Sequence, residues 1–237
     1  MSDHVKLGAP LPHWTPPPAP DGVPLDGTFV RLERLDPDIH AGDLHRAYSG
    51  HDGLWSYLPY GPFSSAAGYH RWAKENASGA DPMFYVLRDR GTGHCGGVAS
   101  YLRISPAAGS IEVGHICLSP EVARSRVWTE AMFLMMDHAF GLGYRRYEWK
   151  CDALNVPSRR AAQRLGFSHE GIFRQMSVVK GRNRDTAWFS VIDTEWSALR
   201  EAYAAWLAPA NFNSAGRQIE RLSDLTGLVR ANSDPDL

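Results

Sequence analysis

Two arginines stand directly before a stretch with helical spacing. Arg124 and Arg126 precede the segment 127–140, in which apolar side chains recur at the period of a helix. The first N–H groups of a helix have no partner within the helix and attract anions, and guanidinium groups bind phosphate oxygens. The two cations are well placed for a pyrophosphate, although two solvated surface arginines would be the preferred interpretation if this segment stood alone.

Two titratable side chains on one alternating segment could take a proton from a reacting group. Glu112 and His115 lie in the segment 110–118, which alternates like a half-buried strand. Strict alternation puts Glu112 on one face with Gly114 and Ile116, and His115 on the opposite face. A cross-strand ion pair competes with a catalytic role for Glu112, and a hydrogen-bonded core position competes for His115, which would titrate near neutral pH.

Polar and aromatic side chains at loops supply the remaining candidates. Asn155 and Ser158 precede a short helical stretch, where such residues are commonly caps. An aromatic loop turns at Pro59 and Gly61, and loops on a rigid scaffold often carry specificity, although its aromatic side chains could simply be packing. A late polar turn holds a carboxylate that could pair with a cation or cap its own turn. The side chains in question are Trp55, Tyr57, Tyr60 and Asp185.

Composition limits the kind of protein. The chain has 237 residues, 43% of them hydrophobic, and a net charge of -1, which argues against a general binder of nucleic acid or membrane surfaces. No signal-peptide pattern and no apolar stretch of spanning length is seen. Cys95, Cys117 and Cys151 share no metal-ligand spacing. We expect reduced core thiols in a cytoplasmic protein and no metal.

The chain divides into three parts. A proline-rich arm at 1–24 should run extended, because proline fixes φ and removes backbone donors. Trp14 either anchors this arm on the domain or lies in a mobile leader. A single domain is expected at 25–208, followed by a polar tail at 209–237 that should be loosely held beyond Asn213.

The elements that position these residues follow from hydrophobic periodicity and turn signals. Strands are expected at 28–35, 83–88, 98–104, 110–118, 147–151, 168–179 and 186–192. Helices are expected at 38–49, 64–80, 127–140 and 157–165, with a final helix that presents an exposed stripe of Trp196, Leu199, Tyr203 and Trp206. An antiparallel meander therefore leads into strand–helix alternation, which indicates a mixed α/β sheet flanked by helices. The exposed stripe makes a homodimer as conceivable as a monomer.

The order of these elements and five short motifs resemble the GNAT superfamily of N-acyltransferases, in particular its branch of ribosomal-protein alanine and serine N-terminal acetyltransferases. The resemblance runs from about 25 to 207. Its carriers are Ile111-Glu-Val-Gly-His-Ile116, Thr129-Glu-Ala131, Asn155-Val-Pro-Ser158, Arg164-Leu-Gly-Phe167 and the Arg184-Asp185 turn. The resemblance implies a GNAT-like mixed sheet of about six to seven strands, with a V-shaped splay between strands 4 and 5 and acetyl-coenzyme A as the acyl donor.

The resemblance also implies which residues hold the donor. Backbone of the splayed strand would pair with pantetheine, and the loop before the long helix would cradle the pyrophosphate. Where the family pattern has glycines, this chain has Arg124 and Arg126, and Trp128 replaces a usual small residue. We therefore expect arginine side chains to hold the phosphates, or the loop to have moved. The expected donor-binding residues are Ile116, Leu118, Arg124, Arg126, Val127, Trp128, Thr129, Asn155, Ser158 and Arg160, and Arg159 could also reach the nucleotide phosphates.

The implied reaction is acetyl transfer to a primary amine by direct attack in a ternary complex. Glu112 would be the base, directly or through a water, and Ser158 would stabilise or protonate the leaving thiolate. The acceptor, a protein N-terminus or a small-molecule amine, would contact Trp55, Tyr57 and Tyr60, with help from the Arg184-Asp185 turn. Two alternatives remain open: another donor, such as a bulkier acyl-coenzyme A or an acyl group on RNA, and a non-catalytic binding module with the same fold.

Overall fold

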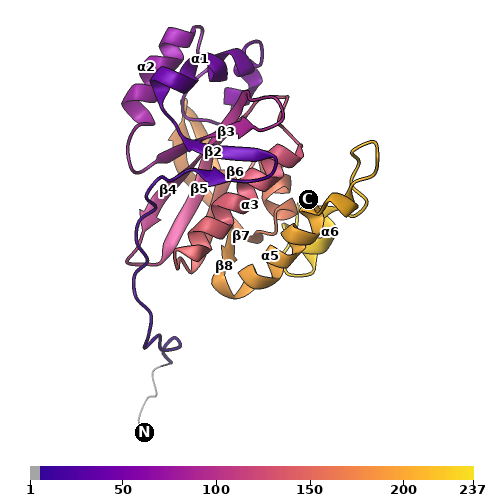
Figure 1. The fold of residues 1–237 in the computed structure, drawn as a ribbon. Helices are drawn as coiled ribbons and strands as arrows, with labels where there is room; N and C mark the ends of the chain where they lie inside the picture. Colours follow the sequence, from indigo (N-terminus) through magenta and orange to yellow (C-terminus); the bar gives the residue numbers. More distant parts are fainter. Residues whose placement is uncertain (1–5) are drawn as a thin grey trace.

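A computed structural model describes residues 6–237 and forms one eight-stranded mixed sheet (Figure 1). The strands are β1 (Leu25–Asp26), β2 (Val30–Arg34), β3 (Met83–Asp89), β4 (Cys95–Ser105), β5 (Ser110–Leu118), β6 (Arg146–Asp152), β7 (Ser168–Val179) and β8 (Arg182–Ile192). The helices are α1 (Pro37–Tyr48), α2 (Ala66–Asn76), α3 (Arg126–Gly141), α4 (Val156–Arg164), α5 (Asp193–Leu207) and α6 (Leu222–Gly227), with short 3-10 turns η1 (Asp52–Trp55) and η2 (Pro209–Asn211).

The sheet has the expected mixed topology. Its order is β1-β2-β3-β4-β5-β6-β8-β7, antiparallel throughout except for the parallel pair β5–β6, which is connected through α3. All seven strands predicted from periodicity are present. The eighth is β1, which pairs with β2 over only two residues and is too short for a hydrophobic period to reveal it.

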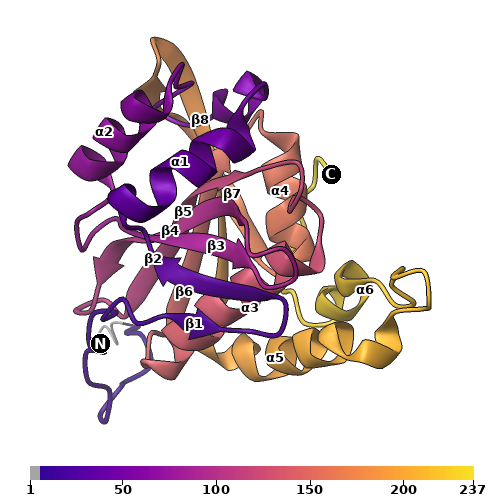
Figure 2. The ribbon, with the colours of Figure 1, turned by 45° about the horizontal axis from the view of Figure 1, so that its top comes forward.

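Helices cover the two faces of the sheet unequally (Figure 2). α3 and α5 pack on one face, where their apolar side chains join the larger hydrophobic cluster. α1 and α2 cover part of the other face and form a smaller aromatic cluster with side chains of β3 and β4. The remainder of that second face, over β6 and β8, carries the polar side chains of Glu148, Lys150 and Ser190 together with Trp188. This asymmetry leaves the second face open for a site.

The final helix does not expose its aromatic stripe. Trp196 and Tyr203 are buried, and both pack against Phe133 on α3 with ring centroids 6.1 and 5.4 Å apart. The expectation of an exposed stripe is therefore wrong, because the apolar face of α5 finds its partner in α3. The stripe gives no support to a dimer.

The C-terminal segment is also held more firmly than its composition suggested. Leu222 and Thr226 on α6 are fully buried, and Thr226 Oγ1 donates to the carbonyl of Arg164 at 3.0 Å. Near the end of the chain, Asp234 is buried beside Arg159 on α4. The expectation of a loose tail beyond Asn213 is wrong, because buried polar contacts hold a segment that shows little hydrophobic periodicity.

The N-terminal arm runs extended, and its first five residues lie outside the described part of the chain. Trp14 lies against Gly109 in the β4–β5 turn, and Pro17 and Pro20 are buried. The structure thus favours the anchored alternative for the later part of the arm, while its beginning projects from the body (Figure 1). Within residues 6–237, no helix is both long and apolar enough to cross a membrane.

Candidate active site

Two neighbouring strands separate in the middle of the sheet. Pairing between β5 and β6 ends at Val113 and Trp149, although β5 continues to Leu118 and β6 to Asp152. Residues 114–118 therefore keep β4 on one side and have no strand on the other. This opening is the expected splay, between the fourth and fifth strands of the main sheet, and it leaves the predicted pantetheine-pairing residues Ile116 and Leu118 on a free edge.

A bulge at the opening reverses the alternation of side chains. His115 has a φ of 51°, and Gly114 and Cys117 lie opposite Ser100 and Val98, so that two residues of β5 face one of β4. Beyond the bulge Ile116 packs with the cluster under α3. The expectation that Ile116 shares a face with Glu112, and that His115 does not, is wrong for this reason.

His115 lies instead with the aromatic side chains of the second face. Its ring stacks on Tyr60 at 5.6 Å and contacts Phe84 at 5.1 Å, and its Nδ1 is 3.2 Å from Tyr60 Oη. Phe84, Ser100 and Gly114 are paired across adjacent strands, which puts them on the face of Glu112. Burial, and then the charges of Arg103 and Arg184, lower the pKa of His115 to about 4. The ring is therefore neutral at pH 7, and His115 is a half-buried, hydrogen-bonded histidine.

Glu112 is a buried carboxylate between two cations. Its side chain is 3% exposed, with Arg103 Nη1 at 2.7 Å from Oε1 and Lys150 Nζ at 2.8 Å from Oε2. Burial raises the pKa of Glu112, and the hydrogen bonds and charges of Lys150 and Arg103 oppose that rise. The cross-strand ion pair is thus present. It does not remove the base role, because a raised pKa brings a carboxylate closer to the operating pH of a general base.

On the α3 side of the opening, Asn155 and Ser158 form the start of α4. Asn155 Oδ1 accepts from the backbone N–H of Ser158 at 3.2 Å and caps the helix. Ser158 Oγ accepts from Trp149 Nε1 at 3.1 Å, which leaves the hydroxyl proton available to another acceptor. Neighbouring Cys151 is buried, and burial raises its pKa to about 11, so it is a neutral thiol at pH 7.

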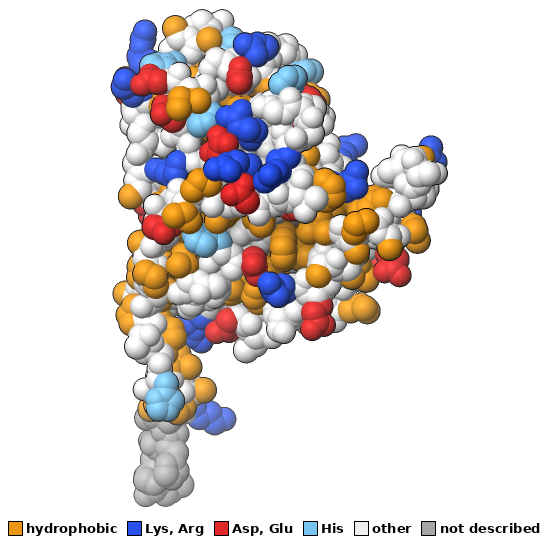
Figure 3. Space-filling view, viewed as in Figure 1, with side chains coloured by type: hydrophobic (Ala, Val, Ile, Leu, Met, Phe, Trp, Pro, Cys, Tyr) orange, Lys and Arg blue, Asp and Glu red, His pale blue; other side chains and the backbone are white. Residues whose placement is uncertain are grey.

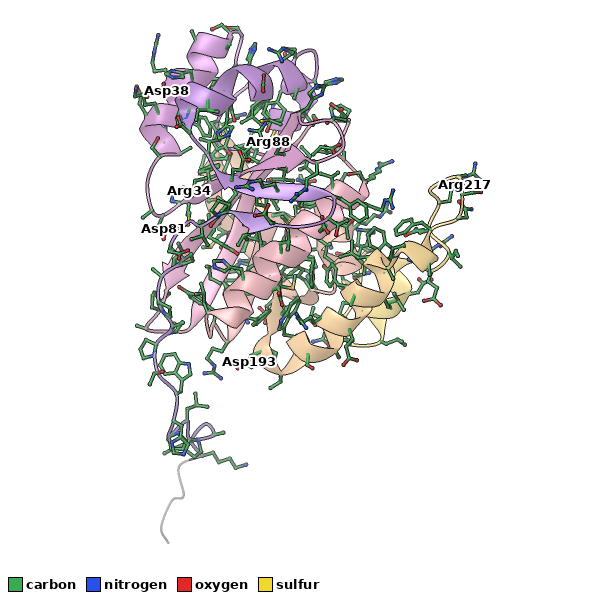
Figure 4. The ribbon with its side chains drawn as sticks, viewed as in Figure 1. Arg34, Asp38, Asp81, Arg88, Asp193 and Arg217 are labelled. Carbon is green, nitrogen blue, oxygen red and sulfur yellow. The ribbon has the colours of Figure 1, made fainter. Side chains whose placement is uncertain are left out.

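A basic cavity of about 890 Å³ opens beside the start of α3. No carboxylate is found among the described side chains that line it. Five arginines line it: Arg124, Arg126, Arg160, Arg164 and Arg217. Of the residues expected from the sequence, four meet here, namely Arg124, Arg126, Trp128 and Arg160. The hollow lies between the body and the projecting C-terminal loop (Figure 3), and Figure 4 places Arg217 on that loop.

The C-terminal wall of this cavity escaped the sequence interpretation. Trp206, Phe212, Arg217 and Gln218 all line it, and Trp206 Nε1 donates to Gln218 Oε1 at 2.8 Å. The cluster of Trp206, Phe212 and Arg217 close to the end of the chain was the available signal. Composition does not reveal this wall, because Phe212 and Arg217 lie in a polar segment with little hydrophobic periodicity.

Other side chains fix the arginines in place. The Arg126 guanidinium lies 4.5 Å from the Phe29 ring and 4.6 Å from the Phe212 ring. Arg164 Nη1 donates to Thr129 Oγ1 at 3.2 Å, and Thr129 is fully buried. Val127 is also buried, in the larger hydrophobic cluster. Val127 and Thr129 therefore support this wall from inside.

Arg159 does not belong to the cavity. Its Nε donates to Asp234 Oδ2 at 2.7 Å, and its side chain is 7% exposed. A second carboxylate, Asp236, lies 3.0 Å from Nη2. The expectation that Arg159 reaches nucleotide phosphates is wrong, because this side chain anchors the C-terminal segment.

The aromatic loop lies on the other side of the opening and is tied to two neighbouring segments. Lys180 Nζ, in the β7–β8 turn, donates to the carbonyls of Trp55 and Tyr60 at 2.8 and 3.0 Å. Tyr57 Oη donates to the carbonyl of Leu154, in the β6–α4 loop, at 3.1 Å. Tyr57 thus contacts the loop that follows β6 and Tyr60 contacts His115 on β5, whereas the Trp55 side chain is buried.

Asp185, on β8, has its carboxylate engaged by its own hairpin. Oδ1 accepts from the backbone N–H of Gln175 at 2.7 Å and from Asn183 Nδ2 at 2.9 Å. These hydrogen bonds, that of Gln175 first, lower the pKa of Asp185. The capping alternative is present in the structure, and contact with an acceptor remains a prediction.

Comparisons with known proteins agree on the family. A family model described as an acetyltransferase (GNAT) domain matches residues 30–168, more than half of the chain. A GCN5-related N-acetyltransferase from Brucella melitensis is 46% identical, with a TM-score of 0.89 over 92% of this chain and 100% of that one. A probable GNAT-family acetyltransferase from Chromobacterium violaceum is 39% identical, with a TM-score of 0.77 over 82% of this chain and 98% of that one.

More distant structures share the fold alone. One is RimL, a ribosomal alpha-N-protein acetyltransferase solved with coenzyme A, at 19% identity and a TM-score of 0.59 over 72% of this chain and 98% of that one. None of the curated proteins compared matches the chain. The splayed sheet, the family model and two structures of high identity lead to one conclusion: this chain belongs to the GNAT family and is a GNAT-type N-acyltransferase.

Proposed function

We propose that the protein transfers an acetyl group from acetyl-coenzyme A to a primary amine, on a protein N-terminus or on a small molecule. The observation that carries the proposal is the basic cavity at the start of α3, which directly follows the free edge of β5. Coenzyme A carries a pyrophosphate and a further phosphate, so a wall of guanidinium groups without a carboxylate matches its charge. A fixed guanidinium also binds phosphate without the close backbone approach that a glycine loop permits.

The α3 N-terminus adds to this anion site. Ser125 caps the helix by accepting from the backbone N–H of Trp128 at 3.3 Å. The preceding N–H groups of the first turn have no acceptor within the helix, and Ser125, Arg126 and Trp128 at this turn line the cavity. Arg124 and Arg160 complete the wall as exposed side chains. Arg126, held between two aromatic rings, supplies a charge of fixed position.

The two sides of the gap together provide the groups for amide formation. The donor supplies an activated acetyl thioester, and the attacking amine must be neutral and must lose a proton. Glu112 accepts that proton, directly or through a water. Free backbone N–H groups at 114–118 are available to polarise the carbonyl. The Ser158 hydroxyl, whose oxygen is already oriented by Trp149, donates to the departing sulfur.

The compartment and the class of acceptor belong to the same proposal. Cys95, Cys117 and Cys151 are free and buried, which fits a reducing compartment such as the cytoplasm. The fold is shared with RimL, named as an acetyltransferase of ribosomal protein and bound to coenzyme A. A protein N-terminus is accordingly one of the two acceptor classes to test.

Calorimetric titration with acetyl-coenzyme A and, separately, coenzyme A tests the donor. We expect micromolar dissociation constants, equivalent to about 8 kcal/mol. R160Q should weaken both about tenfold, because it removes one charge-assisted hydrogen bond. R71Q is the matched control, since Arg71 is an exposed arginine on α2, away from the cavity. Absence of binding by either ligand would refute the acetyl-coenzyme A proposal and turn the search to another acyl carrier.

A further inference from the structure

One row of side chains on β8 shares the face of the candidate base. Register across β5, β6 and β8 aligns Glu112 with Glu148 and Ser190, and Lys150 with Trp188. Two residues further on, Thr186 lies opposite Asp152, the last residue of β6. Arg184 continues this alternation beyond the end of β6, and the neighbouring Asp185 carbonyl accepts from Ala153 N–H at 2.8 Å. Arg184 therefore lies at the mouth of the gap, on the acceptor side.

The buried charges deeper on this face are paired. Glu112 is held by Lys150 and Arg103, at 2.8 and 2.7 Å. Glu148 is held by Lys150 and Arg146, at 2.8 and 2.6 Å. Lys150 also lies 3.8 Å from the centroid of the Trp188 ring. These groups need no further counter-ion.

At the mouth of the gap, Arg184 differs from nearby charged side chains that hydrogen bonds hold in place. Lys180 donates to two carbonyls, Asp185 accepts from its own hairpin, and Asp81 accepts from the backbone N–H groups of Arg103 and Ile104. Arg184 has neither an ion pair nor a side-chain hydrogen bond within the described residues, and its Nε is buried. A buried donor left without an acceptor is destabilising, so the Arg184 guanidinium calls for a partner.

We propose that Arg184 binds an anionic oxygen group of the acceptor, so that the preferred substrates are amines that also carry a carboxylate or a phosphate. This rests on the proposed acetyltransferase function. The planar guanidinium matches either anion through two parallel hydrogen bonds. A polyamine or an aminosugar would instead bring a second positive charge against an arginine that has no counter-ion. The position of Arg184 agrees with this role. Its charge contributes to the lowered pKa of His115, on β5, and opposes the rise in the pKa of Cys151, on β6.

Matched acceptors that differ in one group test the inference. The pairs are glycine with glycinamide and phosphoethanolamine with ethanolamine, assayed with acetyl-coenzyme A on the full-length protein. We expect the acidic member of at least one pair to have a kcat/KM at least tenfold higher, and the pair that responds identifies carboxylate or phosphate as the group bound. R184Q should remove that preference through a higher KM for the acidic amine, with little change for its neutral partner. R182Q, an exposed arginine in the same hairpin, should keep the preference.

The outcomes separate this inference from the function on which it rests. Donor titration by calorimetry needs no acceptor, so a protein that binds no acetyl-coenzyme A and acetylates no amine refutes the proposed function. If the protein binds the donor but acetylates neutral and acidic amines at equal rates, the role of Arg184 is overturned and the proposed function stands. The role of Arg184 is also overturned if R184Q keeps the preference for the acidic amine. R184K serves if R184Q folds poorly, because it keeps the charge and loses the planar fork, and it should retain only part of the preference.

Discussion

At the scale of single residues, the most consequential arrangement is a carboxylate that is both paired and buried. Glu112 lies between Lys150 and Arg103, and its side chain is 3% exposed. A carboxylate with two cations in water would titrate below its ordinary pKa, but loss of solvent raises the pKa of Glu112 despite them. The pair therefore holds the carboxylate in one orientation while burial keeps it basic enough to take a proton.

E112Q should lower kcat by about a hundredfold or more, the usual contribution of a general base, with unchanged affinity for acetyl-coenzyme A. The base acts when deprotonated, so wild-type kcat/KM should rise with pH through the raised pKa of Glu112, and that limb should vanish in E112Q. E148Q is the matched control, because it removes a carboxylate from the same lysine. Both variants are measured by steady-state kinetics from pH 5 to 9. An equal decrease in kcat in E112Q and E148Q would assign Glu112 a structural role only.

At the scale of elements, periodicity identified the strands and failed at one residue of β5. Seven strands and five helices could be predicted because each carries several residues of period 2 or 3.6. The bulge at His115 could not, since one residue of φ 51° leaves the hydrophobic pattern almost intact and yet exchanges the faces of His115 and Ile116. To assign residues beyond a bulge to one face of the sheet, the pairing register of the strands must be known, and a single sequence does not contain it.

The start of α3 is an element whose stability and function can be separated. Ser125 Oγ accepts from Trp128 N–H, and Ser125 lines the basic cavity. S125A should lower the free energy of unfolding by about 1 kcal/mol and weaken coenzyme A binding several-fold, because the first turn of the anion site frays. S65A is the control: Ser65 caps α2 through Gly68 N–H, away from the cavity. Urea unfolding measures the change in stability, and calorimetry measures the affinity for coenzyme A. If the two variants bind coenzyme A equally well, the start of α3 does not contact the donor.

At the scale of the whole molecule, the C-terminal segment couples folding to the shape of the basic cavity. It docks on α4 through Asp234 and Arg159, and the preceding loop carries Arg217 to the far wall of the cavity. A composition-based interpretation could not find this, because the segment is polar and its anchors are one buried ion pair and a short helix. The domain boundary drawn at 209 therefore separates, in sequence, residues that line one cavity.

The buried ion pair gives the last prediction. D234N should lower the free energy of unfolding at pH 7 by about 3 kcal/mol, because it leaves Arg159 buried beside an uncharged partner. Burial alone would raise the pKa of Asp234, but Arg159 lowers it overall, so this contribution is complete above the unfolded pKa of about 4 and is lost as the pH falls through the folded pKa. D236N, whose side chain is 63% exposed, should cost under about 1 kcal/mol. Equal urea midpoints for the two variants at pH 7 would show that Asp234 does not anchor the segment.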